Sequence, residues 1–240
     1  MLGDIKRSKS ITFMQQCFSE ALGTFMLVFA VGVTQGDPLS VAPTLWAAMI
    51  ATGFISGAQF NPAVSIAVMV HAILSKAHDL KNKVIMSIIF IIIQLSFGLF
   101  GAYIAYFVIN TDYKPLMYFD VSNDYLSGEA FLAEVFFTTV LAGCAVTAGN
   151  FTKSNILAGG IVATTVSAGD FSIGKYSGGC FNPAVGFGVN MIKKAIDGGS
   201  SHRVWLYLLA PSFGGVLAGV FSTFFLHYKK DVNQMRKAFY

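Results

Sequence analysis

Two asparagines carry the clearest chemical signal in this sequence, because each stands directly before a proline in nearly the same nine-residue segment. The first segment, Ser56–Val64, reads SGAQFNPAV, and the second, Ser177–Val185, reads SGGCFNPAV. Seven of the nine positions are identical, and Asn61 lies 121 positions before Asn182 in a chain of 240 residues. Asparagine is a favoured helix N-cap and proline a favoured first helical residue. Each box therefore predicts a helix whose capping amide can donate a hydrogen bond to the oxygen of a passing molecule.

The composition places these boxes in a membrane protein. Hydrophobic residues make up 55% of the chain and charged residues only 12%, whereas a soluble domain carries about 25% charged residues. A soluble protein with a very large core is disfavoured by three runs without Asp, Glu, Lys or Arg, at Pro38–Val70, Val84–Thr111 and Val204–Leu226. About 20 apolar helical residues span a bilayer. We therefore interpret the chain as a multi-pass integral membrane protein that contacts the lipid bilayer.

The pattern of apolar runs and breaks predicts an all-α membrane protein forming one domain over residues 1–240. Six spanning helices are expected at about Phe13–Val33, Thr44–Ile55, Val84–Ile109, Gly128–Gly149, Asn155–Ala168 and Val204–His227. Shorter helices follow the boxes at Pro62–Leu74 and Pro183–Lys193, and we interpret them as re-entrant half-helices. Repeat 1 covers 13–110 and repeat 2 covers 127–228. Because each repeat has an odd number of spans, the repeats are inverted, an arrangement whose broken helices meet near the midplane. Non-spanning backbone at that depth indicates a water-filled passage.

The positions of lysine and arginine predict the orientation, since cytoplasmic loops carry an excess of these residues. With both termini on one side, eleven of the 16 residues lie there and five lie opposite. The eleven are Lys6, Arg7, Lys9, Lys76, Lys81, Lys83, Lys153, Lys229, Lys230, Arg236 and Lys237; the five are Lys114, Lys175, Lys193, Lys194 and Arg203. Both termini are therefore expected to face the cytoplasm. The C-terminal segment, Lys229–Tyr240, is expected to be a basic tail.

Two Asn-Pro-Ala boxes in an inverted six-helix repeat resemble the aquaporin (major intrinsic protein) family over nearly the whole chain. The box residues are Asn61, Pro62, Ala63, Asn182, Pro183 and Ala184. The resemblance implies a right-handed helical bundle whose half-helices meet with their asparagines at the pore, and a homotetramer with one pore per protomer. It also implies a structural role for the buried polar residues Glu20, Gln94 and Glu134, in which the glutamates accept bonds from loop amides. We favour this role over a proton relay, which would defeat the selectivity of the pore.

The chemistry of the boxes agrees with a channel for water or small neutral solutes. Each half-helix places about half a positive elementary charge at its N-terminus, so two facing ends repel cations. The residues before each asparagine are non-helical, and their carbonyls can form a ladder of acceptors along one wall. These pore-lining loop residues are Gly57, Ala58, Gln59, Gly178 and Cys180. A hydrogen-bonding wall opposite an apolar one suits a single file of small solutes.

The expected outer selectivity filter departs from the family pattern. Val185 stands where most aquaporins have arginine after the second box, and Asp170 and Gly179 fall at two further filter positions. The fourth position is Val41 by counting or Leu45 by helix spacing. Asp170 either faces the outer vestibule with Gly179 and Val185, giving a wide filter without a cation, or ends its helix and bonds to Ser172 or loop amides.

Gln59 replaces the usual histidine of the first box, and an aspartate that would mark an aquaglyceroporin is replaced by Gly186. The leading hypothesis is a passive channel for water or small uncharged solutes such as glycerol, urea, ammonia or peroxide. The alternatives are an ion or weak-acid conductor that exploits Asp170, and a non-conducting membrane scaffold packed through Gly215 and Gly219. The sequence predicts no enzyme, cofactor or nucleic-acid partner. Three cysteines lack metal-ligand spacing, and no metal site is expected.

Overall fold

The computed structural model describes residues 11–110, 115–198 and 203–239, and the elements in these residues are helices. They are α1 (Phe13–Val33), α2 (Pro38–Ser56), α3 (Pro62–Leu74), α4 (Leu80–Asn110), α5 (Ser127–Phe151), α6 (Asn155–Ser177), α7 (Pro183–Asp197) and α8 (Val204–Phe239). Within these residues, six helices are long and apolar enough to cross a membrane, and α3 is a shorter apolar helix. The predicted all-α membrane fold is confirmed.

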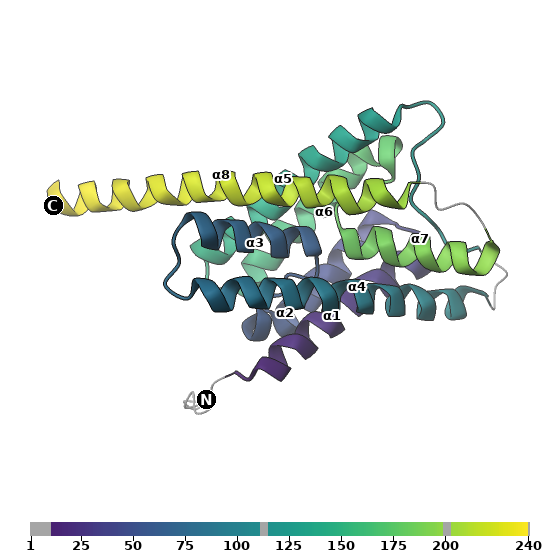
Figure 1. Cartoon of the computed structure of the whole chain (residues 1–240), viewed down its shortest axis with the longest axis horizontal. Coiled ribbons are helices and arrows are strands. Elements are labelled where there is room, and N and C mark those ends of the chain that lie inside the picture. Colours follow the sequence, from purple (N-terminus) through teal and green to yellow (C-terminus); the bar gives the residue numbers. More distant parts are fainter. Residues whose placement is uncertain (1–10, 111–114, 199–202, 240) are drawn as a thin grey trace.

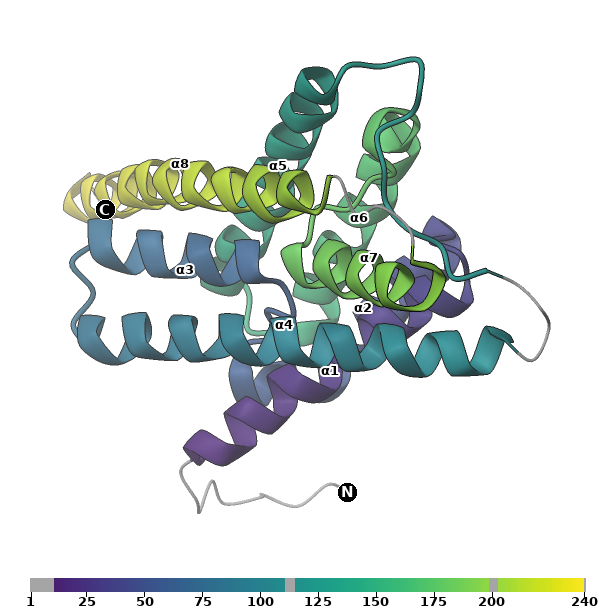
Figure 2. The same ribbon diagram turned by 45° about the vertical axis from the view of Figure 1, so that its right-hand side comes forward.

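The half-helices α3 and α7 occupy the middle of the bundle and point away from each other. Both begin near its centre, and α3 runs toward the side of the C-terminus while α7 runs toward the opposite side (Figures 1 and 2). Each half-helix also packs against the last spanning helix of the other half, α3 against α8 and α7 against α4. The two halves of the chain therefore interlock around their half-helices.

Glycines allow these crossings to be unusually close. A Cβ atom on Gly98 of α4 would lie 2.5 Å from the carbonyl oxygen of Ala184, and one on Gly215 of α8 would lie 2.3 Å from that of Ala63. Small residues that let helix backbones touch are a recurring device in membrane bundles. Gly219 contacts α3 in the same way, so the glycine face of α8 serves packing within the protomer.

Three helix boundaries differ from the sequence prediction by six residues or more. Helix α2 begins at Pro38, not Thr44, and continues through Pro43; a proline this near a helix start removes one backbone bond, which a membrane bundle tolerates. Helix α6 continues nine residues beyond Ala168 to Ser177, because Gly169 packs against Phe137 and Phe181 instead of breaking it. Helix α8 extends to Phe239 through the segment expected to be a basic tail.

Smaller differences occur at the remaining ends. Helix α7 reaches Asp197, beyond the predicted end at Lys193, and Gly198, with a φ of 63°, closes the helix. The first residue of α1 and the end of α8 lie on the same side of the bundle, and the chain leaves α4 on the opposite side (Figure 1). Which side is cytoplasmic stays a prediction. The orientation prediction rests partly on cations outside the described residues, namely Lys6, Arg7, Lys9 and Lys114. The same holds for the side chains of Lys229, Lys230, Arg236 and Lys237.

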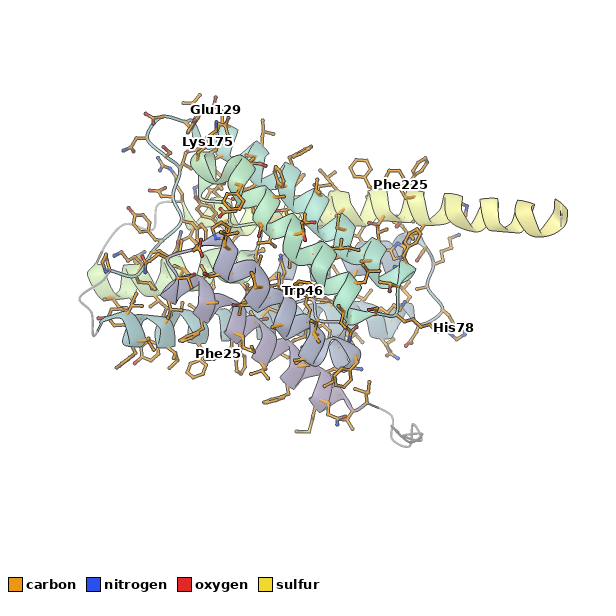
Figure 3. The ribbon with its side chains drawn as sticks, turned by 180° about the vertical axis from the view of Figure 1, so that it is seen from behind. Phe25, Trp46, His78, Glu129, Lys175 and Phe225 are labelled. Atoms are coloured by element: carbon orange, nitrogen blue, oxygen red, sulfur yellow. The ribbon has the colours of Figure 1, made fainter. Side chains whose placement is uncertain are left out.

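The outer faces of the spanning helices are apolar, as a bilayer requires. Phe54, Leu132 and Phe224 are between 66% and 69% exposed, and aromatic side chains project outward from α1 and α8 near Phe25 and Phe225 (Figure 3). The polar glutamates Glu20 and Glu134 are instead fully buried. This distribution is the reverse of that in a soluble protein and places the polar chemistry along the bundle axis.

Gly215→Ala is expected to destabilise the protein, because the added methyl group would overlap the carbonyl oxygen of Ala63 and push α8 from α3. Overpacking of this kind costs about 1–3 kcal/mol, and a domain of this size loses about 2–4 °C of melting temperature per kcal/mol. The matched control is Gly128→Ala, where a Cβ meets nothing within 4 Å. Thermal unfolding in detergent measures both variants, and equal melting temperatures would contradict the packing argument.

The paired asparagine caps and the cavities beside them

The two boxes are joined by reciprocal hydrogen bonds between the halves of the chain. The Asn61 amide donates from Nδ2 to the carbonyl oxygen of Phe181 at 2.9 Å, and the Asn182 amide donates to that of Phe60 at 2.9 Å. The Oδ1 atoms of the two side chains accept from the backbone N–H groups of Ala63 (2.8 Å) and Ala184 (2.9 Å). A carboxamide has two N–H donors, so the second donor of each amide is left for a molecule in the adjoining cavity.

These caps bring two helix N-termini together. Asn61 opens the 13 residues of α3 and Asn182 opens the 15 residues of α7, each followed by proline at the first helical position. Each N-terminus carries about half a positive elementary charge. Both ends point toward the same region and contribute partial positive charge to it.

The segments before the asparagines share an unusual backbone. Gly57, Ala58 and Phe60 have φ values of 91°, 50° and 48°, and the corresponding residues of the second box have 86°, 69° and 52°. Left-handed geometry costs residues other than glycine about 1–3 kcal/mol each. Gly57 and Gly178 also act as the left-handed C-caps that end α2 and α6. In each repeat, this backbone geometry turns the chain sharply from a spanning helix into a box.

Buried glutamates hold these strained segments. Glu20 accepts hydrogen bonds from Ser56 Oγ (2.6 Å) and from the backbone N–H groups of Gln59 (3.0 Å) and Phe60 (2.8 Å). Gln94 of α4 donates to the same carboxylate at 2.8 Å and also bonds to Ser65 of α3. The carboxylate thus satisfies loop amides that have no helical partner.

Glu134 makes the matching set of bonds in the second half. It accepts from Ser177 Oγ (2.6 Å) and from the backbone N–H groups of Cys180 (2.9 Å) and Phe181 (2.8 Å). The partners are the same three box positions, each 121 residues further along the chain. These bonds to loop amides are the ones that the resemblance implied for Glu20 and Glu134, and the structural role of both residues and of Gln94 stays a prediction.

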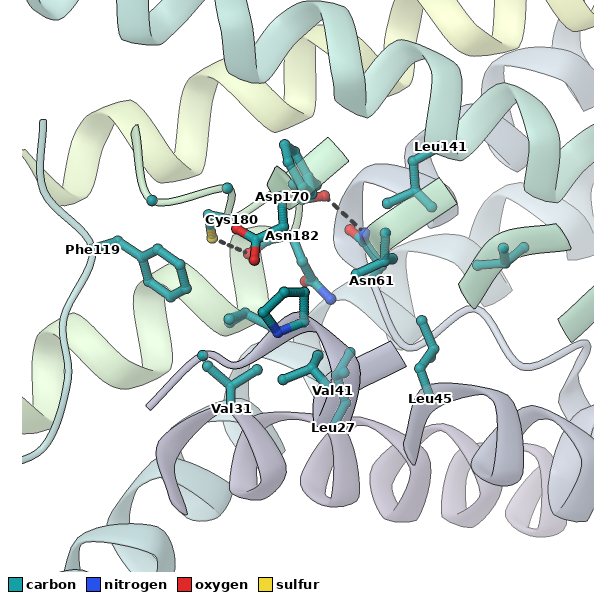
Figure 4. A pocket seen from close by; sticks show the side chains of 18 of the residues that line it. Leu27, Val31, Val41, Leu45, Asn61, Phe119, Leu141, Asp170, Cys180 and Asn182 are labelled. Atoms are coloured by element: carbon teal, nitrogen blue, oxygen red, sulfur yellow. Dashed lines mark hydrogen bonds between the residues drawn. The ribbon is translucent and has the colours of Figure 1, made fainter. Parts of the chain in front are cut away.

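Two cavities meet at the asparagine pair. After the predicted orientation, we call the cavity on the side of Gly179 and Asp170 the outer cavity and the cavity on the side of His71 and Lys153 the inner cavity. Gln59, Val64 and Val162 line both cavities, so the cavities adjoin at the level of the boxes. Asn61 and Asn182 lie among the apolar side chains of the outer cavity (Figure 4).

The structure places all the predicted filter residues in the wall of the outer cavity: Val41, Leu45, Asp170, Gly179 and Val185. Val41 and Leu45, between which the sequence left a choice, both belong to it because α2 is longer than expected. Of the predicted loop residues, Gly178 and Cys180 line the outer cavity, Gly57 and Ala58 line the inner one, and Gln59 lines both. Their roles in selectivity stay predictions.

Asp170 does not end its helix, so the alternative in which it caps that end is wrong. Seven further residues of α6 follow it, and Ser172 Oγ donates instead to the carbonyl of Ala168 at 2.6 Å. A Cβ on Gly179 would lie 2.2 Å from the Asp170 carboxylate, which shows how closely the two residues fit. Among the described residues, none donates a hydrogen bond to this carboxylate.

Phe119 was not among the predicted site residues, because the mixed charges of the connection after α4 are typical of a surface loop. Phe119 lines the outer cavity and packs against Tyr207 with 5.6 Å between ring centroids. Its backbone N–H and carbonyl both bond to the side chain of Asn190, at 2.8 and 2.9 Å, and Arg203 bonds to the adjacent Asp120 at 2.6 Å. Asn190, the one polar side chain between Pro183 and Ile192, was the available signal in the sequence.

Comparisons with known proteins agree on one family. A model of the family described as major intrinsic protein matches residues 7–222. The chain is 30% identical to "Glycerol uptake facilitator protein-like 6" of Lactiplantibacillus plantarum over 85% of this chain and 95% of the relative. It is 26% identical to "Probable aquaporin NIP4-2" of Arabidopsis thaliana over 95% of this chain and 80% of the relative.

A solved structure shares the fold. The aquaglyceroporin from Plasmodium falciparum superimposes with a TM-score of 0.73, covering 88% of this chain and 96% of its own, at 20% sequence identity. Identity this low speaks for the fold alone, and it matches the arrangement of helices around α3 and α7.

Glu134→Gln is expected to loosen the second box, because an amide at this site places N–H groups against the backbone donors of Cys180 or Phe181. A buried donor left without a partner costs about 1–3 kcal/mol. The matched control on the same helix is Glu129→Gln, an exposed residue. Thermal unfolding in detergent measures both; a Glu134 variant as stable as the Glu129 variant would show that the anchor is dispensable.

Proposed function

The chain belongs to the major intrinsic protein family, and from this premise we propose that it is a passive channel for water and small uncharged solutes. The observation that supports the proposal most strongly is the meeting of two asparagine-capped helix N-termini where the outer and inner cavities adjoin. Such an arrangement offers a continuous polar contact to a solute that leaves bulk water.

Transport proceeds by exchange of hydrogen bonds along one wall. A solute oxygen accepts from the free N–H groups of Asn61 and Asn182, while solute hydrogens bond to the carbonyls of the non-helical box segments. The facing wall is apolar, with Leu27, Val31 and Leu141 in the outer cavity. A solute is held by few groups at a time, so it binds well enough to enter and weakly enough to leave.

Cations are excluded at the centre by the two positive helix ends. Each end contributes about half an elementary charge, and the surrounding residues are buried, so the charges are poorly screened. Electrostatic barriers of this kind, together with pore diameter and lining groups, decide selectivity. The channel therefore passes neutral molecules without coupling to an ion gradient.

The outer filter admits solutes larger than water. Gly179 contributes no side chain, and Val185 is shorter than the arginine that most family members have at this position. Glycerol-like polyols, urea, ammonia and peroxide are the expected solute class. A relative named as a glycerol uptake facilitator is consistent with this class.

We further propose that the protein assembles as a homotetramer with both termini in the cytoplasm. The apolar exposed faces of the spanning helices, such as those carrying Phe54 and Leu132, are surfaces for lipid or for neighbouring protomers. The positive side chains of Lys76, Lys81, Lys83 and Lys153 lie on the side of the α3–α4 turn and the α5–α6 turn, which favours that side as cytoplasmic.

Val185→Arg is expected to narrow the range of solutes, because a long cationic side chain would enter the outer cavity. Glycerol permeability should fall about tenfold more than water permeability, which corresponds to about 1.4 kcal/mol of added barrier. Stopped-flow light scattering of proteoliposomes measures water, glycerol and urea. Val185→Leu controls for bulk without charge, and an unchanged ratio in the arginine variant would remove Val185 from the filter.

The competing hypothesis of an ion or weak-acid conductor rests on the unpaired carboxylate of Asp170. The channel proposed here should carry no K⁺ or Cl⁻ current in a planar bilayer under conditions where vesicles containing it conduct water. Appreciable current through the wild-type protein would favour the conductor. Water and glycerol permeabilities that both equal those of empty vesicles would favour a non-conducting scaffold.

A further inference from the structure

The outer cavity contains one charged group. Among the described residues that line it, Asp170 is the only carboxylic acid, and none is a lysine, arginine or histidine. Its carboxylate accepts no hydrogen bond from a described residue, although it lies against Gly179 within the wall. A carboxylate held in partly apolar surroundings gains strongly from a positively charged hydrogen-bond donor.

Two basic groups on the same side of the bundle contact other residues. The Lys175 ammonium lies 5.0 Å from the ring centroid of Tyr176 on the exposed side of α6. Arg203 pairs with Asp120 at 2.6 Å. Asp37, exposed at the start of α2, adds a second negative charge near the mouth and is itself outside the lining. The cavity therefore has a negative entrance, and the described residues supply no counter-ion to it.

The remaining wall complements an organic cation better than a hydrated metal ion. Phe119, Val41 and Val185 give it apolar surface, and the Phe119 ring is held in place by Asn190 and Tyr207. An aromatic ring near a carboxylate attracts weakly hydrated cations such as guanidinium. A strongly hydrated ion would lose its water without finding a cage of oxygens to replace it.

Farther in, the potential changes sign. Any molecule that passes Asp170 meets the amides of Asn61 and Asn182 and the N-termini of α3 and α7, all of which present hydrogen-bond donors or partial positive charge. A cation is thus attracted to the outer cavity and repelled from the next step. It would stop in the path of neutral solutes.

We propose that the outer cavity is a binding site for a small organic cation with several N–H donors, of the guanidinium or ammonium type, and that the bound cation blocks the channel. Asp170 supplies the charge, and Phe119 with the two valines supplies the apolar contact. This site goes beyond the proposed transport of neutral solutes, and only its blocking effect depends on that transport.

Guanidinium is the probe, because it keeps its charge at neutral pH and cannot cross as a neutral base. Urea is its neutral isostere and KCl controls for ionic strength. In proteoliposomes, millimolar guanidinium should reduce water permeability saturably, whereas equal urea or KCl should not. Each variant is compared with its own unblocked permeability. In vesicles that conduct water, guanidinium without effect on the water permeability of the wild type, or urea as effective as guanidinium, would overturn the proposal.

Asp170→Asn should raise the half-blocking concentration of guanidinium at least about tenfold, the effect of losing one charge-assisted contact. The matched control is Asp37→Asn, which removes an equal charge outside the cavity lining. This variant should raise the half-blocking concentration less than about threefold, because exposed charges are screened. Equal shifts in the two variants would show general attraction instead of a site. A guanidinium current would show that the cation passes, which also overturns the proposal.

Isothermal titration calorimetry of the purified wild-type protein separates binding from transport. Saturable guanidinium binding, absent with urea, is expected even if vesicles show no water permeability, an outcome that would reject the transport function alone. Should Asp170→Asn fail to assemble, Phe119→Leu serves as the second variant and should weaken guanidinium binding about twofold to fivefold through loss of the ring contact. No calorimetric binding to the wild type would reject the site.

Discussion

The pair of hydrogen bonds from Asn61 and Asn182 to the carbonyls of Phe181 and Phe60 is the interaction on which the rest of the structure depends. Each bond joins one half of the chain to the other, so neither box can hold its position alone. Through these bonds, α3 and α7 meet at their N-termini and not at their sides. The positive potential, the free amide donors and the boundary between the two cavities all follow from that one contact.

A bilayer makes this contact costly unless the loops beside it are fully bonded. Inside hydrocarbon, an unpaired backbone group costs several kcal/mol, and the box segments are not helical. Glu20 and Glu134 remove that cost by accepting the amides that precede each asparagine. Because the amides are turned toward the glutamates, carbonyls of the same segments remain for solutes. A buried charge, usually a liability in a membrane, is here the means by which the passage acquires its polar wall.

The outer cavity shows how the same framework can carry a different filter. In the proposed filter, Val185, Gly179 and Asp170, which line this cavity, stand in place of a cationic, crowded entrance, and the asparagine pair lies behind them. Two electrical steps of opposite sign then lie in series, negative at the mouth and positive at the centre. We propose that neutral solutes are little affected by either step, whereas a cation is drawn to the first and stopped by the second.

The sequence was enough to predict the all-α membrane fold, the two half-helices and the burial of Glu20 and Glu134. These features are visible because hydrophobic run length, the doubled boxes and isolated acids in apolar helices are local or periodic patterns.

Other features depend on which distant residues meet in the fold, so they could be seen only in the structure. Helix α2 begins at Pro38 and α6 continues past Gly169 because packing outweighs the local helix-breaking tendency of proline and glycine. Phe119 enters the outer cavity because Asn190, 71 residues later, binds its backbone, and Asp170 faces the same cavity because Gly179, from the following loop, leaves room for its carboxylate.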